Sequence, residues 1–219
     1  MRHHHLLIAL SITTVGCDAP LEGDVIAVGD SIFDYNVEEG ASIPAVIGET
    51  LGLEVANAAV GGAQVLGGDA PIPDQYQSGD WDWAVMDGGG NDMNDRCGCG
   101  ECDEVMDTLI SSDGASGAIP ELVATALDDG ARVAWVGYYD LAEGAEFGFD
   151  RCGEELIELR ARTAAMAEGD EDVIFVDASE AFTADELDHY DDDRVHPSIK
   201  GGRAVGELVA AAMLAAEAR

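Results

Sequence analysis

Residues 24–32 read DVIAVGDSI, a short apolar run that ends in a glycine, an acid and a serine. The run is rich in β-branched residues and too short for a helix, so it predicts a buried strand over residues 24–29. In sheets of parallel strands covered by helices, ligands bind beyond the carboxyl ends of the strands. We therefore expect Ser31 to stand where a side chain can reach a bound molecule.

Outward from this strand, apolar runs alternate with stretches of helical periodicity. Strands separated by helices predict βαβ units and a three-layer α/β/α fold with a five-stranded parallel sheet. No linker divides the chain, so residues 24–219 are expected to form one domain. Residues 59–80 and 92–103 are expected to be long loops. The other predicted strands are 53–58, 81–86, 132–136 and 172–176, and the predicted helices are 43–51, 120–127, 154–167 and 202–218.

The composition allows a full hydrophobic core but excludes some partners. Hydrophobic residues make up 47% of the 219 residues, which is enough to bury a core. There are 45 acidic and 10 basic residues, for a formal net charge of −35. Nucleic acids and anionic lipid surfaces are bound by clustered Lys and Arg. Neither is therefore expected as a direct partner.

The first residues, MRHHHLLIALSITTVG, have the pattern of an export signal. Arg2 precedes an apolar run over residues 6–15, which is too short to span a bilayer and suits a signal peptide over residues 1–16. The small residues directly before Cys17 resemble the bacterial lipobox, so Cys17 is a lipidation candidate and residues 17–23 a tether. Ordinary cleavage is the alternative. The protein is expected in the bacterial cell envelope, touching the membrane only through this anchor, or else secreted.

Four further cysteines follow: Cys97, Cys99, Cys102 and Cys152. An even number in an oxidising compartment predicts two disulfides, and four cysteines allow three pairings. We expect Cys152 to join one member of the cluster at 97–102 and so to tie two distant loops together. Three thiols within six residues, with Cys152 as a fourth ligand, are an alternative metal site.

The ends of the predicted strands carry residues suited to acyl transfer. A serine hydroxyl is a weak nucleophile that needs a base within hydrogen-bond reach. His196 could take the proton of Ser31 and later give it to a leaving alcohol, and Asp193 could hold the imidazole in the required tautomer. His189 is a rival base, but it lacks the Asp-x-x-His context. The four signals are GDSI at 29–32, NAAVGG at 57–62, GGND at 89–92 and DRVHP at 193–197.

The tetrahedral intermediate of acyl transfer also requires hydrogen-bond donors for its oxyanion. Backbone N–H groups in glycine-rich turns and the amide of an asparagine are suitable donors. Gly61 or Gly62, together with Asn91, could converge on Ser31 because all of them follow strands of the same predicted sheet.

Taken in order, these signals resemble the SGNH or GDSL hydrolases, a family of serine esterases, lipases and carbohydrate deacetylases on a flavodoxin-like α/β/α sheet. The family's first block, Gly-Asp-Ser-Leu, matches residues 29–32 with Ile32 in place of Leu. Its third block, Gly-x-Asn-Asp, matches residues 89–92. Its last block, Asp-x-x-His-Pro, matches residues 193–197.

The resemblance implies a role for each matched residue. Ser31 would be the nucleophile, and its own N–H would also serve the oxyanion hole. The spacing of the second block selects Gly62 over Gly61 as a donor, and Asn91 would supply the third. The catalytic triad would then be Ser31, Asp193 and His196.

The leading interpretation is a serine hydrolase that cleaves carboxylic esters through an acyl-enzyme. Its substrate would be a small-molecule, glycan or lipid ester, and no metal or organic cofactor is expected. Three alternatives stay open. They are acyl transfer to a sugar or alcohol at the same site, a non-catalytic exported binding lipoprotein with a relict site, and a thiol or metal protein built on the cysteine cluster.

Overall fold

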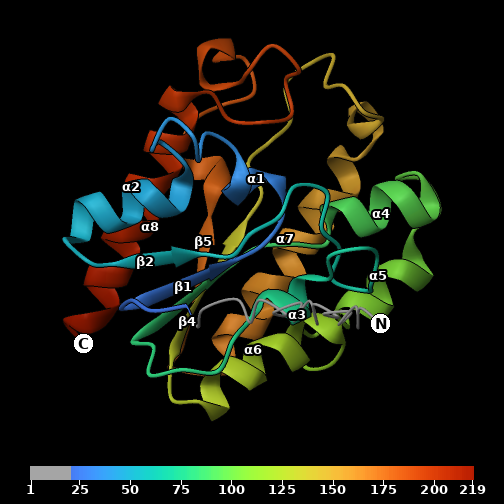
Figure 1. Ribbon diagram of the computed structural model, residues 1–219. Coiled ribbons are helices and arrows are strands. Elements are labelled where there is room, and N and C mark those ends of the chain that lie inside the picture. The colour runs from blue at the N-terminus through green and yellow to red at the C-terminus, as the bar shows by residue number, and fades with distance from the viewer. Residues whose placement is uncertain (1–20) are drawn as a thin grey trace, which may run out of the picture.

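The computed structural model describes residues 21–219, which form one parallel sheet between two layers of helices (Figure 1). The strand order is β2-β1-β3-β4-β5, and every neighbouring pair is parallel. The predicted α/β fold class is therefore confirmed. The predicted export segment and Cys17 lie outside the described residues. The strands are β1 (Val25–Val28), β2 (Val55–Asn57), β3 (Trp83–Met86), β4 (Arg132–Gly137) and β5 (Val173–Asp177).

Helices α2 and α8 pack together on one face of the sheet, and α6 and α7 cover the other (Figure 1). None of the helices in residues 21–219 combines the length and apolarity needed to cross a membrane. The helices are α1 (Ser31–Asp34), α2 (Ile43–Leu51), α3 (Ile72–Gln75), α4 (Gly90–Cys97), α5 (Asp103–Leu109), α6 (Ala118–Asp128), α7 (Gly153–Glu168) and α8 (Ile199–Glu217). Short 3₁₀ turns are η1 (Phe149–Arg151), η2 (Ala178–Glu180) and η3 (Leu187–His189).

The central strands are buried on both faces, which explains their sequence. All four residues of β1 and of β3 are buried. A parallel strand between two helix layers reads as a continuous apolar run because neither of its faces meets water. On the α2/α8 side, the helices approach closely at Gly206. A Cβ atom there would lie 2.6 Å from Cβ of Val46, so a larger residue would force the two helices apart.

Two of the expected loops contain helices, so the prediction of loops was wrong over part of their length. Helix α4 occupies the first part of the expected loop 92–103, and α3 lies within 59–80. The sequence of α4 has no apolar stripe, because Met93 is its only buried large apolar side chain. Tertiary contacts, not helical periodicity, hold this helix in place.

The four cysteines form two disulfides, Cys97–Cys102 and Cys99–Cys152. The second joins residues 53 apart in sequence and ties the end of α4 to the start of α7. Because both bonds together use all four thiols, none is left as a thiolate ligand. Within residues 21–219, no group of three or more His, Cys, Asp or Glu side chains is placed to hold a metal ion.

Candidate active site

Ser31 stands at the first turn of α1, directly beyond the carboxyl end of the buried strand β1. The carboxylate of Asp30 caps this helix by accepting the N–H of Ile32 at 2.9 Å. The first N–H groups of a helix have no acceptor within it, so the N–H of Ser31 is free for a ligand. The Ser31 hydroxyl makes no hydrogen bond with the residues that the structure describes. Both groups are thus available to a substrate.

The imidazole of His196 is held by a carboxylate. Nδ1 of His196 lies 2.7 Å from Oδ2 of Asp193, and Oδ1 of Asp193 accepts the backbone N–H groups of Val195 and His196 at 2.9 and 2.8 Å. Burial acts to raise the pKa of Asp193, but the hydrogen bonds from the His196 ring and the two backbone groups outweigh it and lower that pKa. Asp193 is therefore ionised at neutral pH and can stabilise a charged imidazole.

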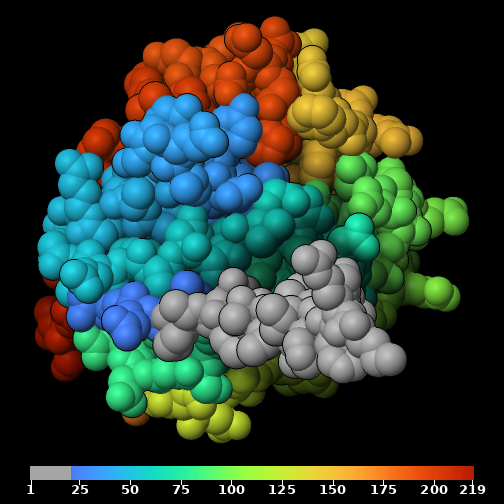
Figure 2. All heavy atoms as spheres, viewed as in Figure 1, coloured from blue at the N-terminus to red at the C-terminus, as the bar shows by residue number. Residues whose placement is uncertain are grey.

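The segment after α1 packs against the loop that carries His196. The ring of Tyr35 stacks on the His196 ring, with centroids 4.5 Å apart and planes 5° apart. The hydroxyl of Tyr35 donates to the carboxylate of Asp191, and Nδ2 of Asn36 donates to the carbonyl of Pro197 at 2.9 Å. In the space-filling view, the blue segment after β1 and the orange-red segment before α8 lie side by side (Figure 2).

The same loop is held from its other side by residues that follow β4. The hydroxyl of Tyr139 donates to the carbonyl of Val195 at 2.6 Å, and the N–H of Glu146 donates to the carbonyl of Asp193 at 2.9 Å. Loops that are anchored at both sides place side chains more accurately than free loops. The pair formed by Asp193 and His196 is thus fixed relative to the sheet.

The glycine-rich turn after β2 offers one free donor. The N–H of Gly61 already donates to the carboxylate of Asp34 at 3.1 Å. Gly62 has a φ of +76°, a conformation that favours glycine, and its N–H donates to no group in the described chain. A Cβ atom at Gly61 would lie 3.9 Å from Cβ of Ser31, so the turn lies against Ser31. Gly62 is accordingly the better candidate for an oxyanion donor.

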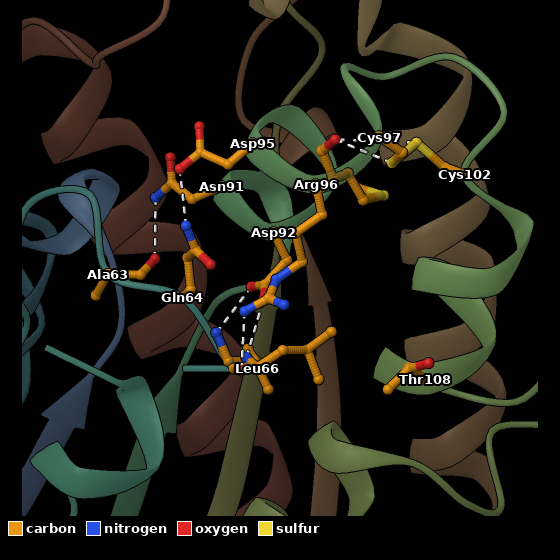
Figure 3. Close-up of polar contacts among 12 residues, drawn as sticks. Ala63, Gln64, Leu66, Asn91, Asp92, Asp95, Arg96, Cys97, Cys102 and Thr108 are labelled. Carbon is orange, nitrogen blue, oxygen red and sulfur yellow. Dashed lines mark hydrogen bonds and ion pairs between the residues drawn. A yellow bond between two sulfur atoms is a disulfide. The ribbon is translucent and has the colours of Figure 1, made fainter. Parts of the chain in front are cut away.

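Asn91 lies in the first turn of α4, after β3, and its amide faces the segment that follows β2. Nδ2 donates to the carbonyl of Ala63 at 3.0 Å (Figure 3). The same Nδ2 lies 3.3 Å from Oδ2 of Asp30. The first of these bonds has the ordinary N–H···O length, while the second is long. A substrate oxyanion could replace the longer contact.

Asp92 fixes the orientation of α4. Its side chain is fully buried, and its two carboxylate oxygens accept the N–H groups of Val65 and Leu66, each at 2.8 Å (Figure 3). The guanidinium of Arg96 lies one turn further along, with Nε 3.5 Å from the same carboxylate. The Gly-x-Asn-Asp motif thereby fixes α4 to the turn after β2.

A buried polar cluster that the sequence motifs did not predict supports the turn carrying Ser31. Oδ1 of Asp87 accepts the N–H of Asp30 at 2.8 Å, and the hydroxyl of Tyr138 donates to the Asp30 carboxylate at 2.6 Å. Gln75 exchanges two hydrogen bonds with the backbone of Gly29. The sequence does contain one signal for this cluster, because Asp87 is an acid directly after a wholly apolar strand.

The carboxyl group of Asp87 is expected to be neutral in the folded protein. It is 1% exposed, and its Oδ2 atom has no hydrogen-bond partner among the described residues. Burial, together with repulsion from Asp30, raises the pKa of Asp87 well above its usual range. A neutral carboxyl here still accepts the Asp30 N–H and so supports the turn that carries Ser31.

Replacing Asp87 with Asn should therefore stabilise the protein at neutral pH. An acid whose pKa is higher in the folded than in the unfolded protein lowers the free energy of unfolding as the pH rises above its unfolded pKa, about 3.9. A difference of one between the two pKa values amounts to about 1.4 kcal/mol. The amide of Asp87→Asn avoids this loss while keeping an acceptor for Asp30. We expect urea unfolding to give a larger free energy for the variant at pH 7.5 and a smaller difference at pH 4.5. A difference independent of pH would show that Asp87 is ionised in the folded state.

A model of the GDSL-like lipase/acylhydrolase family matches residues 27–204, most of the chain. The chain belongs to this family. The match includes Ser31, Gly62, Asn91, Asp193 and His196, so the whole candidate site of this GDSL hydrolase lies within the family domain.

Solved structures agree on the fold of the GDSL hydrolase. A carbohydrate acetylesterase from Sinorhizobium meliloti superposes with a TM-score of 0.64 at 15% identity, covering 87% of this chain and 98% of that one. A GDSL-like lipase from Bacteroides thetaiotaomicron gives a TM-score of 0.62 at 19% identity, covering 88% of each chain. A search of curated proteins found no match. At such low identity these structures support the fold and not a particular substrate.

The structure brings the candidate residues of this GDSL hydrolase to one edge of the sheet. Ser31 and Asn91 line a small cavity together with Val195, the neighbour of His196. No hydrogen bond joins Ser31 to His196 here, and such bonds often form only in the substrate complex. The rival base His189 is 7% exposed, with its ring stacked on Phe182 at 4.7 Å. It is a packing residue.

Proposed function

We propose that this GDSL hydrolase cleaves carboxylic esters through an acyl-enzyme on Ser31. The observation that carries the proposal is the 2.7 Å distance between Nδ1 of His196 and Oδ2 of Asp193. The loop that bears this pair packs, through the stacking of His196 on Tyr35, against the segment that begins with Ser31, whose hydroxyl is free. A nucleophile, a base and a group that orients the base are the three parts that serine acyl transfer requires.

The reaction would proceed in two stages. Oγ of Ser31 attacks the ester carbonyl carbon while Nε2 of His196 takes its proton, and the proton then passes to the departing alcohol. In the second stage, His196 takes a proton from water, which attacks the acyl-enzyme and releases the acid. Asp193 stays ionised throughout and stabilises the charged imidazole in both stages.

The developing negative charge on the carbonyl oxygen would be bound by three donors. These are the N–H of Ser31, the N–H of Gly62 and Nδ2 of Asn91. The first two are free in the described chain, so they are already arranged for a ligand. Removal of one such donor typically lowers kcat by about 10²–10³-fold.

The charge of the protein favours a neutral substrate. A net charge of −35 repels anions, whereas uncharged small-molecule, glycan or lipid esters are not repelled. Because the protein has few basic residues, nucleic acids are not proposed as partners.

We propose, from residues 1–17, that the protein is exported. If it is anchored, a lipid on Cys17 would be its only contact with the membrane.

The ester hydrolase proposal is tested on neutral p-nitrophenyl esters of different acyl length. We expect release of acid and p-nitrophenol, no inhibition by a metal chelator, and complete inactivation by a serine-directed phosphonate. Activity that survives the phosphonate but is lost with the chelator would contradict the mechanism and favour a metal enzyme.

A further inference from the structure

The aromatic side chain of Phe147 is exposed beside His196. It is 63% exposed, the largest fraction among the large apolar side chains of the described residues. The centroid of its ring lies 6.1 Å from the centroid of the His196 ring, and the two planes are inclined at 59°. Single exposed apolar side chains are common on protein surfaces. This one matters because the proton of the proposed reaction passes through the neighbouring imidazole.

The backbone of Phe147 is strained. Its φ is +57°, in the left-handed region that glycine enters freely and that bulky side chains rarely adopt. Strain of this kind persists only where the surrounding contacts enforce it, and it is found most often at active sites and ligand-binding segments. For stability alone a glycine would fit this position better, so the presence of Phe147 points to a role for its ring.

Contacts with two parts of the candidate site hold this backbone in place. The carbonyl of Phe147 accepts Nδ2 of Asn94 at 3.0 Å, and Asn94 belongs to α4, which also carries Asn91. The N–H of Glu146 donates to the carbonyl of Asp193 at 2.9 Å. In the space-filling view, the gold segment accordingly lies between the green α4 and the orange-red loop (Figure 2). The backbone of Phe147 is thus bound to the elements that carry an oxyanion donor and the base.

The segment that contains Phe147 is also closed on itself and tied to α4 by a covalent bond. The N–H of Phe149 donates to the carbonyl of Glu146 at 3.0 Å, and the N–H of Cys152 donates to the carbonyl of Phe149 at 2.9 Å. Cys152 is bonded to Cys99, just beyond the end of α4. These bonds limit the rearrangements by which the strained residue could relax.

The proposed mechanism decides which part of a substrate would come near this ring. Nε2 of His196 gives its proton to the oxygen of the departing alcohol, so that oxygen must come within about 2.6–3.2 Å of Nε2. The acyl carbon is held instead at Ser31 and the oxyanion donors. The group attached to the alcohol oxygen therefore lies beside the His196 ring, next to which Phe147 is exposed.

We propose that Phe147 is a specificity-determining residue that binds the alcohol part of the ester and favours an alcohol with apolar surface next to the ester oxygen. This inference rests on the ester hydrolase function proposed above. Such a group covers the exposed ring of Phe147 and removes apolar surface of both from water. An alcohol with polar atoms at this place gains less, because these atoms would lose hydrogen bonds to water without replacement.

The test compares kcat/KM for benzyl acetate and 2-methoxyethyl acetate, two uncharged acetates whose primary alcohols differ in apolar surface. The ratio of the two values is taken for each protein, so that the intrinsic reactivity of the esters cancels between variant and wild type. Phe147→Ala should lower the benzyl-to-methoxyethyl ratio by about tenfold, the size of effect that loss of an aromatic contact produces. The loss should appear in KM, because the contact forms in the bound substrate as well as in the transition state.

A second variant separates the ring from the strained backbone. Phe147→Gly removes the ring and also relieves the strain, since glycine adopts this conformation freely, and it should show the same lowered ratio. The matched control is Leu214→Ala. Leu214 is a 53% exposed apolar residue near the C-terminal end of α8, so its variant should keep the wild-type ratio.

A wild-type ratio in both Phe147 variants would overturn this inference and leave the ester hydrolase function standing. An equal fall in kcat for both esters would also overturn it, because Phe147 would then act through His196 and not on the alcohol. A wild type that cleaves p-nitrophenyl esters but not benzyl acetate would again refute only the role of Phe147. A wild type that cleaves none of these esters would refute the ester hydrolase function as well.

Discussion

Replacing Ser31 with Ala should lower kcat/KM for p-nitrophenyl acetate by about 10⁴-fold or more, because loss of a triad nucleophile removes the acyl-enzyme route. The residual rate would come from the oxyanion donors and substrate binding. Stability should hardly change, since the Ser31 hydroxyl has no hydrogen-bond partner in the described chain. We expect the unfolding free energy to stay within about 0.5 kcal/mol of the wild type.

A matched control separates this effect from general perturbation. Ser112 is exposed in the turn between α5 and α6, far along the chain from every candidate site residue. Ser112→Ala should retain full ester hydrolysis. If Ser31→Ala kept more than a tenth of the wild-type rate, another group would have to be the nucleophile.

Asp193→Asn should lower kcat by about 10⁴-fold while leaving the fold intact. The carboxylate accepts the Nδ1–H of His196, and this leaves Nε2 unprotonated to receive the serine proton. An amide can present its N–H₂ group to Nδ1 instead, which stabilises the wrong tautomer. Steady-state kinetics with saturating p-nitrophenyl acetate checks the loss of kcat.

The control for this variant is the adjacent acid. Asp192 is exposed and makes no hydrogen bond or ion pair with the His196 ring, so Asp192→Asn changes the charge by the same amount without altering the bond between Asp193 and His196. It should keep the wild-type kcat. Loss of activity in both variants would mean that the acidic loop acts through its total charge, and the orienting role of Asp193 would then be wrong.

The sequence predicts the sheet well because β1 and β3 are buried on both faces and read as unbroken apolar runs. It also predicts α2 with the observed bounds, 43–51. It fails at α4, whose residues are mostly polar and whose position depends on Asp92 and on the disulfides. Such contacts join residues that are distant in sequence, so local periodicity does not report them.

The sequence likewise predicts only part of the candidate site. Motif order and spacing identify Ser31, Asn91 and His196, because each motif follows a strand or precedes a helix of a predictable sheet. The supporting residues Asp87 and Tyr138 are single polar side chains within apolar surroundings. Their partner, Asp30, is 57 and 108 residues away, so only the folded chain reveals the cluster.

The most direct test of the central claim is to locate the covalent adduct of a serine-directed phosphonate by mass spectrometry. The protein is labelled to completion, its intact mass is measured, and the modified peptide is sequenced. We predict one adduct per chain, on Ser31, with ester hydrolysis lost in proportion to labelling. An adduct on a different residue, or ester hydrolysis that continues without any adduct, would contradict the assignment of Ser31 as the nucleophile.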